Sequence, residues 1–188
     1  ILQLDLLENI CQHIRIPRSH ILANHSAPKS NGPLIFKSIS AHRSIVKKFN
    51  PTAAKNVTEP VLFQELLPGL NIRTTVMADK IFALSIKSEN LDYRYGNHNQ
   101  YKTFHLPTII AEECKTIAQA LHLPLCGIDL ILYQDNYYIL EVNPSPGYAF
   151  FEKKIPGEPI SEAILSWLQT SKLHSTTIKM ETSHCHLN

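Results

Sequence analysis

The sequence has no hydrophobic run long enough to cross a bilayer and no run of basic residues longer than a pair. A membrane-spanning helix needs about 20 apolar residues, and nucleic-acid-binding chains usually carry a strongly basic stripe. This 188-residue chain has a formal net charge of only +2 and fits neither class. We therefore expect no membrane and no nucleic acid among its partners.

Cysteine is also scarce and shows no motif. The four cysteines form no C-x-x-C pair, and a chain of this length can bury a core without disulfides. We expect free thiols and a reducing, cytoplasmic compartment. The histidines on either side of Cys185 lack the spacing of a folded zinc site. The chain starts at Ile1 without a signal-peptide pattern, which suggests a fragment or an omitted upstream segment.

The remaining composition is typical of a soluble globular protein, with 44% hydrophobic and 18% charged residues in one domain or two small lobes. Stretches with the period of a strand alternate with stretches with the period of a helix. They predict helices over 1–15, 108–122 and 158–171, strands over 34–37 and 61–67, and a hairpin over 71–88. They also predict a loop over 38–60, with at most a short strand near 44–46, and a loop over 91–105. The hairpin indicates a sheet that is at least partly antiparallel.

The segment 126–143 predicts a second hairpin, with a three-residue turn at 134–136. Asp129 and Glu141 are equidistant from the middle of this turn, so we expect them to be cross-strand partners with Cβ atoms about 4.5–5.5 Å apart. Asn143 shares their face because strand side chains alternate. Opposed carboxylates repel each other, and a hard cation with oxygen ligands, Mg²⁺ above all, would relieve the repulsion.

The same alternation divides the other side chains of this hairpin. It places Ile139 on the face of the two acids and Leu140 on the opposite face, which we expect to be core. A simpler interpretation stays open at this point. The two acids would then lie on a solvated face, and Asn143 would be only a turn residue before Pro144.

The run GIDLILYQDNYYILEVNPSPG, residues 127–147, resembles the C-terminal core of the ATP-grasp superfamily. In that family a strand Asp and a following Glu-x-Asn bind the metals that bridge the ATP phosphates. Phe36-Lys37, the segment 64–69 and Asn71-Ile72-Arg73 occur in the family's order. The combination is most similar to the branch of ribosomal-protein S6 glutamate ligases and microviridin-type peptide maturases, over roughly residues 1–170.

The resemblance implies an α+β fold of the ATP-grasp type, in which two α/β lobes with mainly antiparallel sheets sandwich the nucleotide. We expect the partial N-terminal lobe at 1–67 and the C-terminal lobe with the metal site at 68–171. Residues 172–188 are polar and are expected to be a disordered tail.

The resemblance also implies nucleotide contacts. Lys37 would contact a phosphate of ATP, although an exposed lysine at a strand end is the simpler interpretation. Glu65, Leu66 and Leu67 would form the hinge whose backbone pairs with adenine, while one of the two leucines packs on the purine. A core strand that runs into a Pro-Gly turn would look the same. Asn71 stands where the family usually has an acid for the ribose hydroxyls.

The implied function is that of an ATP-dependent carboxylate-amine (or -hydroxyl) ligase that acts through an acyl-phosphate on a peptide or amino acid. Asp129, Glu141 and Asn143 would hold Mg²⁺ (or Mn²⁺), with two ions expected. Arg73 and Arg94 would stabilise phosphate or acyl-phosphate oxygens. Each arginine could equally be a surface ion-pair partner.

Two departures from the family pattern support other functions. Residues 38–50 contain no glycine, although ATP-grasp enzymes often close a glycine-rich loop over the phosphates. The family's usual N-terminal domain also has no room in this chain. One alternative is a non-catalytic ATP/Mg-binding or partner-recognition module. Another is a peptide-binding domain with 88–106 as its contact surface. The donor, the acceptor and the oligomeric state, a homo-oligomer included, stay open.

Overall fold

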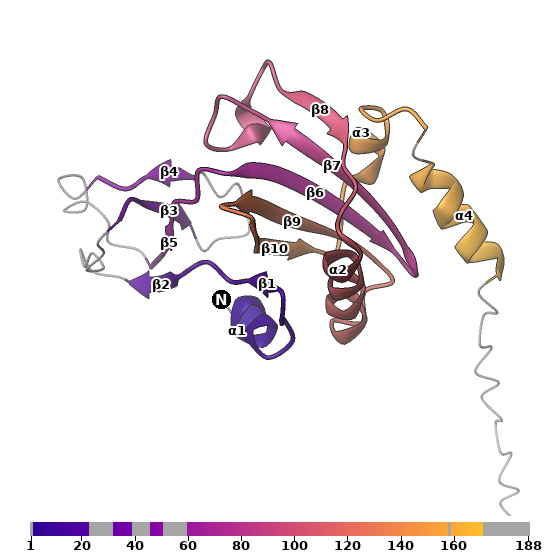
Figure 1. The fold of residues 1–188 in the computed structure, drawn as a ribbon, viewed down its shortest axis with the longest axis horizontal. Coiled ribbons are helices and arrows are strands. Elements are labelled where there is room, and N and C mark those ends of the chain that lie inside the picture. Colours follow the sequence, from indigo (N-terminus) through magenta and orange to yellow (C-terminus); the bar gives the residue numbers. More distant parts are fainter. Residues whose placement is uncertain (1, 23–31, 39–45, 51–59, 158, 171–188) are drawn as a thin grey trace, which may run out of the picture.

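The computed structural model describes residues 2–22, 32–38, 46–50, 60–157 and 159–170, which form two sheets with flanking helices (Figure 1). In spatial order the larger sheet consists of β1 (Ile14–Arg15), β10 (Asn136–Asn143), β9 (Leu125–Tyr133), β6 (Leu70–Met77), β7 (Lys80–Lys87) and β8 (Gln100–Thr103). The smaller sheet consists of β2 (Ser19–Leu22), β5 (Val61–Glu65), β3 (Leu34–Ser38) and β4 (Lys47–Lys48). Every pairing is antiparallel except that of β1 with β10, which confirms the expected mainly antiparallel α+β arrangement.

Helices cover both faces of the larger sheet, and their order along the chain is α1 (Leu2–Glu8), α2 (Thr108–Ala120), α3 (Tyr148–Glu152) and α4 (Ile160–Thr170). On one face, Ile110, Cys114 and Ile117 of α2 join a core with the alternate residues Ile72 and Val76 of β6. The residues between them, such as Arg73, therefore point to the other face. The described helices include none long and apolar enough to cross a membrane.

The helix expected over 1–15 is shorter in the structure. It ends at Glu8, and residues 14–15 form β1 beside β10 instead. The carboxylate of Glu113 on α2 accepts the backbone N–H groups of residues 12–14 at 2.5–3.3 Å. These N–H groups would bond within the chain segment if the helix continued. A long-range contact therefore ends the helix, and the local pattern contains no sign of it.

The loop expected over 91–105 is only partly irregular. It contains a short 3₁₀ helix, η2 (Tyr93–Tyr95), and the strand β8, which pairs with the edge of β7. An exposed edge strand needs no apolar alternation, so its polar sequence resembles a loop. In the polar stretch 38–60, the described residues 47–48 form β4. The expected bounds of the two lobes stay a prediction, although β1 of the first range belongs to the larger sheet.

The turn of the β9–β10 hairpin has two residues, so the expected three-residue turn is wrong. Gln134 and Asp135 both adopt left-handed conformations, with φ of 48° and 58°. This is the arrangement of a type I′ turn, whose twist matches that of paired strands. The pairs that follow are Asn136 with Tyr133 and, further along, Ile139 with Leu130.

A β-bulge then corrects the register of the hairpin. The pairing shifts by one residue between Ile139 and Glu141, so that Glu141 lies opposite Asp129 as expected. The turn has one residue fewer than predicted, and the bulge adds one, so the two differences cancel at the acids. The faces near the turn do change, because Ile139 is fully buried in the core and Leu140 lines the cavity described below.

Candidate functional site

A cavity of about 1030 Å³ is lined by residues of both sheets and of the segment 88–99. Its size is at the upper end of the range for small-molecule sites. All ten residues singled out from the sequence line this cavity, and they are Lys37, Glu65, Leu66, Leu67, Asn71, Arg73, Arg94, Asp129, Glu141 and Asn143. The structure thus brings together side chains from positions more than 100 residues apart.

Asp129 and Glu141 face each other on the cavity side of the β9–β10 hairpin. Asn143 is at the end of β10, and its Oδ1 accepts the backbone N–H of Ser145 at 3.0 Å. That bond fixes the side chain and leaves a second lone pair on the amide oxygen. Two carboxylates and an amide oxygen are hard ligands, so the residues present fit Mg²⁺ or Mn²⁺.

The pKa of Glu141 reflects its burial and the repulsion between the two carboxylates. Partial burial between the cavity walls and the nearby carboxylate of Asp129 raise the pKa of Glu141 above its ordinary value. Lys37 and Arg94 lower it and offset part of the effect. A bound divalent cation would offset both causes, because its positive charge favours the ionised carboxylate.

The carboxylate of Asp129 is held from behind by Arg73. Nη1 of Arg73 donates to Oδ2 of Asp129 at 2.6 Å, and Nη2 donates to the carbonyl oxygen of Pro146, also at 2.6 Å. The guanidinium lies 5.1 Å from the ring centroid of Phe151 and occupies the space that a β-carbon at Gly127 would need. Arg73 is only 4% exposed, so its charge interacts with groups inside the protein and not with solvent.

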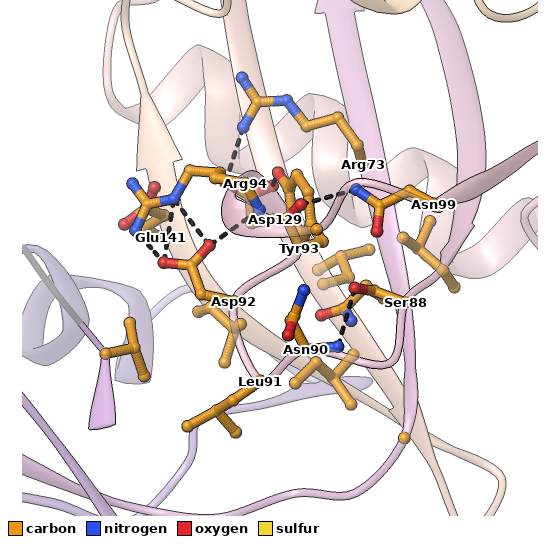
Figure 2. Close-up of a pocket in the computed structure, with 18 of the residues that line it drawn as sticks. Arg73, Ser88, Asn90, Leu91, Asp92, Tyr93, Arg94, Asn99, Asp129 and Glu141 are labelled. Carbon is orange, nitrogen blue, oxygen red and sulfur yellow. Dashed lines mark hydrogen bonds and ion pairs between the residues drawn. The ribbon is translucent and has the colours of Figure 1, made fainter. Parts of the chain in front are cut away.

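The segment 88–99 brings a tyrosine and a second arginine to the same site (Figure 2). The hydroxyl of Tyr93 donates to Oδ1 of Asp129 at 3.2 Å. Burial and the charge of Asp129 raise the pKa of Tyr93, so the hydroxyl keeps its proton and acts as the donor. Arg94 lies beside it, with Nη2 2.6 Å from Oδ2 of Asp92.

Lys37 approaches the acids from the smaller sheet. Its Nζ donates to Oε1 of Gln64 at 3.0 Å, and Nε2 of Gln64 donates to Oγ of Ser19 at 3.0 Å. Burial lowers the pKa of Lys37, while the carboxylates of Glu141 and Asp129 act in the opposite direction. Among the described residues, the ammonium group thus has one acceptor, Gln64, and it lies at the edge of the cavity.

The expected hinge follows β5 and is tied to neighbouring segments. Glu65 accepts the Nε–H of Arg18 at 3.1 Å, and its own N–H donates to the Arg18 carbonyl at 3.0 Å. The N–H of Leu66 donates to the carbonyl of Pro33 at 2.9 Å. Within the described residues, the N–H of Leu67 is the hinge donor with no protein acceptor.

Several cavity residues were missed by the sequence interpretation. Asp92, Tyr93 and Asn99 were counted only as part of a polar loop, and Phe150 and Lys154 of the α3 region were not considered. The ammonium of Lys154 lies 5.2 Å from the ring centroid of Phe150. One signal was available: asparagine and aspartate recur in 88–99, and their side chains often fold a loop on itself. His184 and His186 lie outside the described residues.

A family model described as a RimK-like ATP-grasp domain matches residues 13–168. The chain is 28% identical over 152 residues to a probable alpha-L-glutamate ligase of Hydrogenovibrio crunogenus, a match that covers 77% of this chain and 48% of that protein. It is 26% identical over 166 residues to a protein of the same name from Haemophilus influenzae, with 79% and 54% covered. The chain spans about half the length of these curated relatives.

Two solved structures are similar over most of the chain. The macrocyclase MdnC of Microcystis aeruginosa, bound with the precursor peptide MdnA, has a TM-score of 0.76 and 26% identity, with 90% of this chain and 60% of that chain covered. The ATP-grasp ligase PsnB, complexed with a minimal precursor, has a TM-score of 0.73 and 24% identity, with 88% and 58% covered. The second likeness shows a shared fold.

Proposed function

Because the chain belongs to the RimK-like ATP-grasp family, we propose that it binds ATP with two Mg²⁺ (or Mn²⁺) ions and joins a carboxylate to an amine or hydroxyl through an acyl-phosphate. One observation carries this proposal. The cavity that contains the opposed pair Asp129 and Glu141 also contains Lys37, Arg94 and the hinge 65–67. These are the parts that a nucleotide with bridging metals requires.

The nucleotide would lie between the two sheets. Within the part of the chain that the structure describes, the N–H groups of Glu65 and Leu66 already have acceptors, so the Leu67 N–H would pair with adenine. Leu66 or Leu67 would pack on the purine, and Asn71 at the start of β6 would meet the ribose. Lys37 lies on the same side as the carboxylates and would contact a phosphate oxygen as a point charge.

Asp129, Glu141 and Asn143 would hold the metal ions, which supply neutralisation of the phosphate charge. Arg94 is the arginine suited to contact the reacting groups, because its side chain is 49% exposed and lines the cavity. It would orient the carboxylate and stabilise the oxygens of the acyl-phosphate. Arg73, with both terminal nitrogens engaged, would act by holding Asp129 in place.

We propose a peptide or an amino acid as the carboxylate substrate. The support comes from relatives named alpha-L-glutamate ligases and from a similar macrocyclase bound with a precursor peptide. The thiols of Cys11, Cys114 and Cys126 are free, which supports a reducing, cytoplasmic compartment.

The test is ADP release from ATP·Mg by the full chain, with glutamate and glutamate-containing peptides offered together with amine acceptors. We expect acceptor-dependent ADP release that Asp129→Ala reduces at least a hundredfold. Asp135→Ala, which removes an exposed acid from the turn of the same hairpin, should leave it unchanged. ADP release that is insensitive to Asp129→Ala would exclude this site as the catalytic centre.

A non-catalytic ATP/Mg-binding module is the second candidate. It is favoured by the absence of glycine from residues 38–50, where a phosphate-covering loop would benefit from close backbone N–H groups. Isothermal titration with ADP and Mg²⁺ separates the two proposals. Nucleotide binding without ADP release for any acceptor supports the non-catalytic module. If the chain neither binds the nucleotide nor releases ADP, ATP is rejected as the ligand.

A further inference from the structure

Tyr93 contacts the carboxylate that the proposed metal site depends on. Asp129 has two carboxylate oxygens, and each accepts from a different protein donor. Oδ2 accepts from Nη1 of Arg73 at 2.6 Å, and Oδ1 accepts from the hydroxyl of Tyr93 at 3.2 Å. Arg73 is on β6, beside the strand of Asp129, whereas Tyr93 comes from the segment 88–99 (Figure 2).

The segment 88–99 is folded so that the position of Tyr93 is defined. Nδ2 of Asn99 donates to the backbone carbonyl of Tyr93 at 2.6 Å and to the hydroxyl of Tyr101 at 3.2 Å. A β-carbon at Gly96 would clash with Oδ1 of Asn99, so Gly96 packs directly against the Asn99 side chain. The backbone of Tyr93 therefore rests on a side chain from the other end of the same segment.

The ring of Tyr93 is positioned by the hydrophobic core as well. It packs with Tyr101 against a cluster of buried residues that contains Leu84 and Ile86 of β7 and Phe151 of α3. The backbone contact and the ring contact together direct the hydroxyl toward Asp129. The hydrogen bond is thus a consequence of the fold of the segment.

A carboxylate that is held at one oxygen can still rotate about its Cβ–Cγ bond, whereas one held at both oxygens keeps its plane. Groups that bond to metal ligands orient them in this way and strengthen metal binding. We propose that the Tyr93 hydroxyl is a positioning group that fixes the plane of the Asp129 carboxylate for the metal ion. This inference rests on the proposed metal site and assigns it a residue from outside the β9–β10 hairpin.

The inference also links two parts of the site. Arg94, the arginine suited to the substrate carboxylate, follows Tyr93 directly in η2. The Nδ2 of Asn99 that supports Tyr93 lies in the same segment. One folded segment would therefore set both the metal ligand and the substrate contact.

The experiment measures Mn²⁺ binding to the full chain in the presence of ADP, by the loss of the electron paramagnetic resonance signal of free Mn²⁺. We expect Tyr93→Phe, which keeps the ring and removes the hydroxyl, to weaken Mn²⁺ binding about three- to tenfold. ADP binding measured in EDTA should stay within about twofold of the wild type. Tyr95→Phe is the matched control, because Tyr95 lies in the same turn but is 58% exposed.

A second variant, Asn99→Ala, removes the side chain that supports the Tyr93 backbone, and its effect in the wild-type background tests the inference whether or not Tyr93→Phe folds. It should weaken Mn²⁺ binding in the wild-type background but have little further effect beside Tyr93→Phe, because both changes act through one hydroxyl. Additive losses, or wild-type affinity in Tyr93→Phe, overturn the positioning role. If Tyr93→Phe binds Mn²⁺ normally while Asp129→Ala does not, the proposed metal site stands and this inference fails. If the wild type binds no Mn²⁺ with ADP, both fail.

Discussion

Arg73 and Asp129 face each other on adjacent strands, with Nη1 2.6 Å from Oδ2 and side-chain exposures of 4% and 13%. A pair this well shielded from water behaves differently from a surface ion pair. Removing one member leaves a charge without its partner in a place where solvent cannot compensate for it. Loss of either partner is therefore expected to destabilise the fold, and the pair also orients the carboxylate that the proposed metal ion would meet.

Arg73→Met tests this pair by removing the charge and keeping most of the side-chain length. We expect the free energy of unfolding, measured by urea titration, to fall by about 3 kcal/mol. Arg18→Met is the control, since Arg18 pairs with Glu65 but is 80% exposed, and it should cost less than about 1 kcal/mol. Equal effects of the two changes would mean that burial of the Arg73 pair is energetically irrelevant.

Gly127→Ala should disturb the same pair from the neighbouring strand. The added β-carbon would collide with the Arg73 guanidinium, which Pro146 and Asp129 hold in place. We expect destabilisation of about 1–3 kcal/mol in urea titration and weaker metal binding. Gly32→Ala is the comparison, because a β-carbon there meets open space. Unchanged stability of Gly127→Ala would show that Arg73 has room to move.

Lys37→Ala should weaken ATP binding about ten- to a hundredfold in titration calorimetry, as expected for a charge-assisted contact to phosphate. Lys47→Ala removes an exposed lysine from the paired strand β4, outside the cavity lining, and should have little effect. Wild-type affinity in Lys37→Ala would remove this lysine from the phosphate site.

The pH dependence of ATP binding should also depend on Lys37. A lysine carries its charge below its pKa, and burial lowers the pKa of Lys37 from the ordinary value of 10.5. The charge is therefore lost at a lower pH than for an exposed lysine. As the pH rises, the wild-type affinity for ATP should start to decrease before pH 10.5 is reached. Lys37→Ala should remove this component of the profile.

The hairpin turn offers a stabilising change. Gln134 and Asp135 have left-handed conformations that ordinary side chains adopt at a cost, whereas Asn-Gly suits a type I′ turn. Gln134→Asn with Asp135→Gly should therefore stabilise the chain by about 1 kcal/mol and raise the Tm by about 2–4 °C in differential scanning calorimetry. A lower Tm would contradict the assignment of the turn.

Short motifs on regular strands were sufficient to predict the main elements of the candidate site. The strand that contains Lys37 follows from a short apolar run, and the hairpin of Asp129 and Glu141 follows from local alternation about a turn. The family match confirms the ATP-grasp resemblance drawn from these residues. The expected fold class is confirmed as well. The roles of the individual side chains stay predictions.

The features that sequence patterns missed depend on contacts between distant residues. The first helix ends at Glu8, and Glu113, about 100 positions away, binds the backbone of residues 12–14, where the helix was expected to continue. The segment 88–99 looks like a loop because side-chain to backbone hydrogen bonds fold it, and such bonds have no hydrophobic period. The hairpin register was correct at the acids although the turn was predicted with one residue too many.

The bulge at Leu140 gives the hairpin a property that a regular strand lacks. Neighbouring side chains of a regular strand point to opposite faces, yet Leu140 and Glu141 both line the cavity. With the extra residue, an apolar side chain and an acidic side chain at consecutive positions of β10 line the same cavity. Removal of the extra residue between Ile139 and Glu141 would shift Glu141 out of register with Asp129, even if every other side chain were kept.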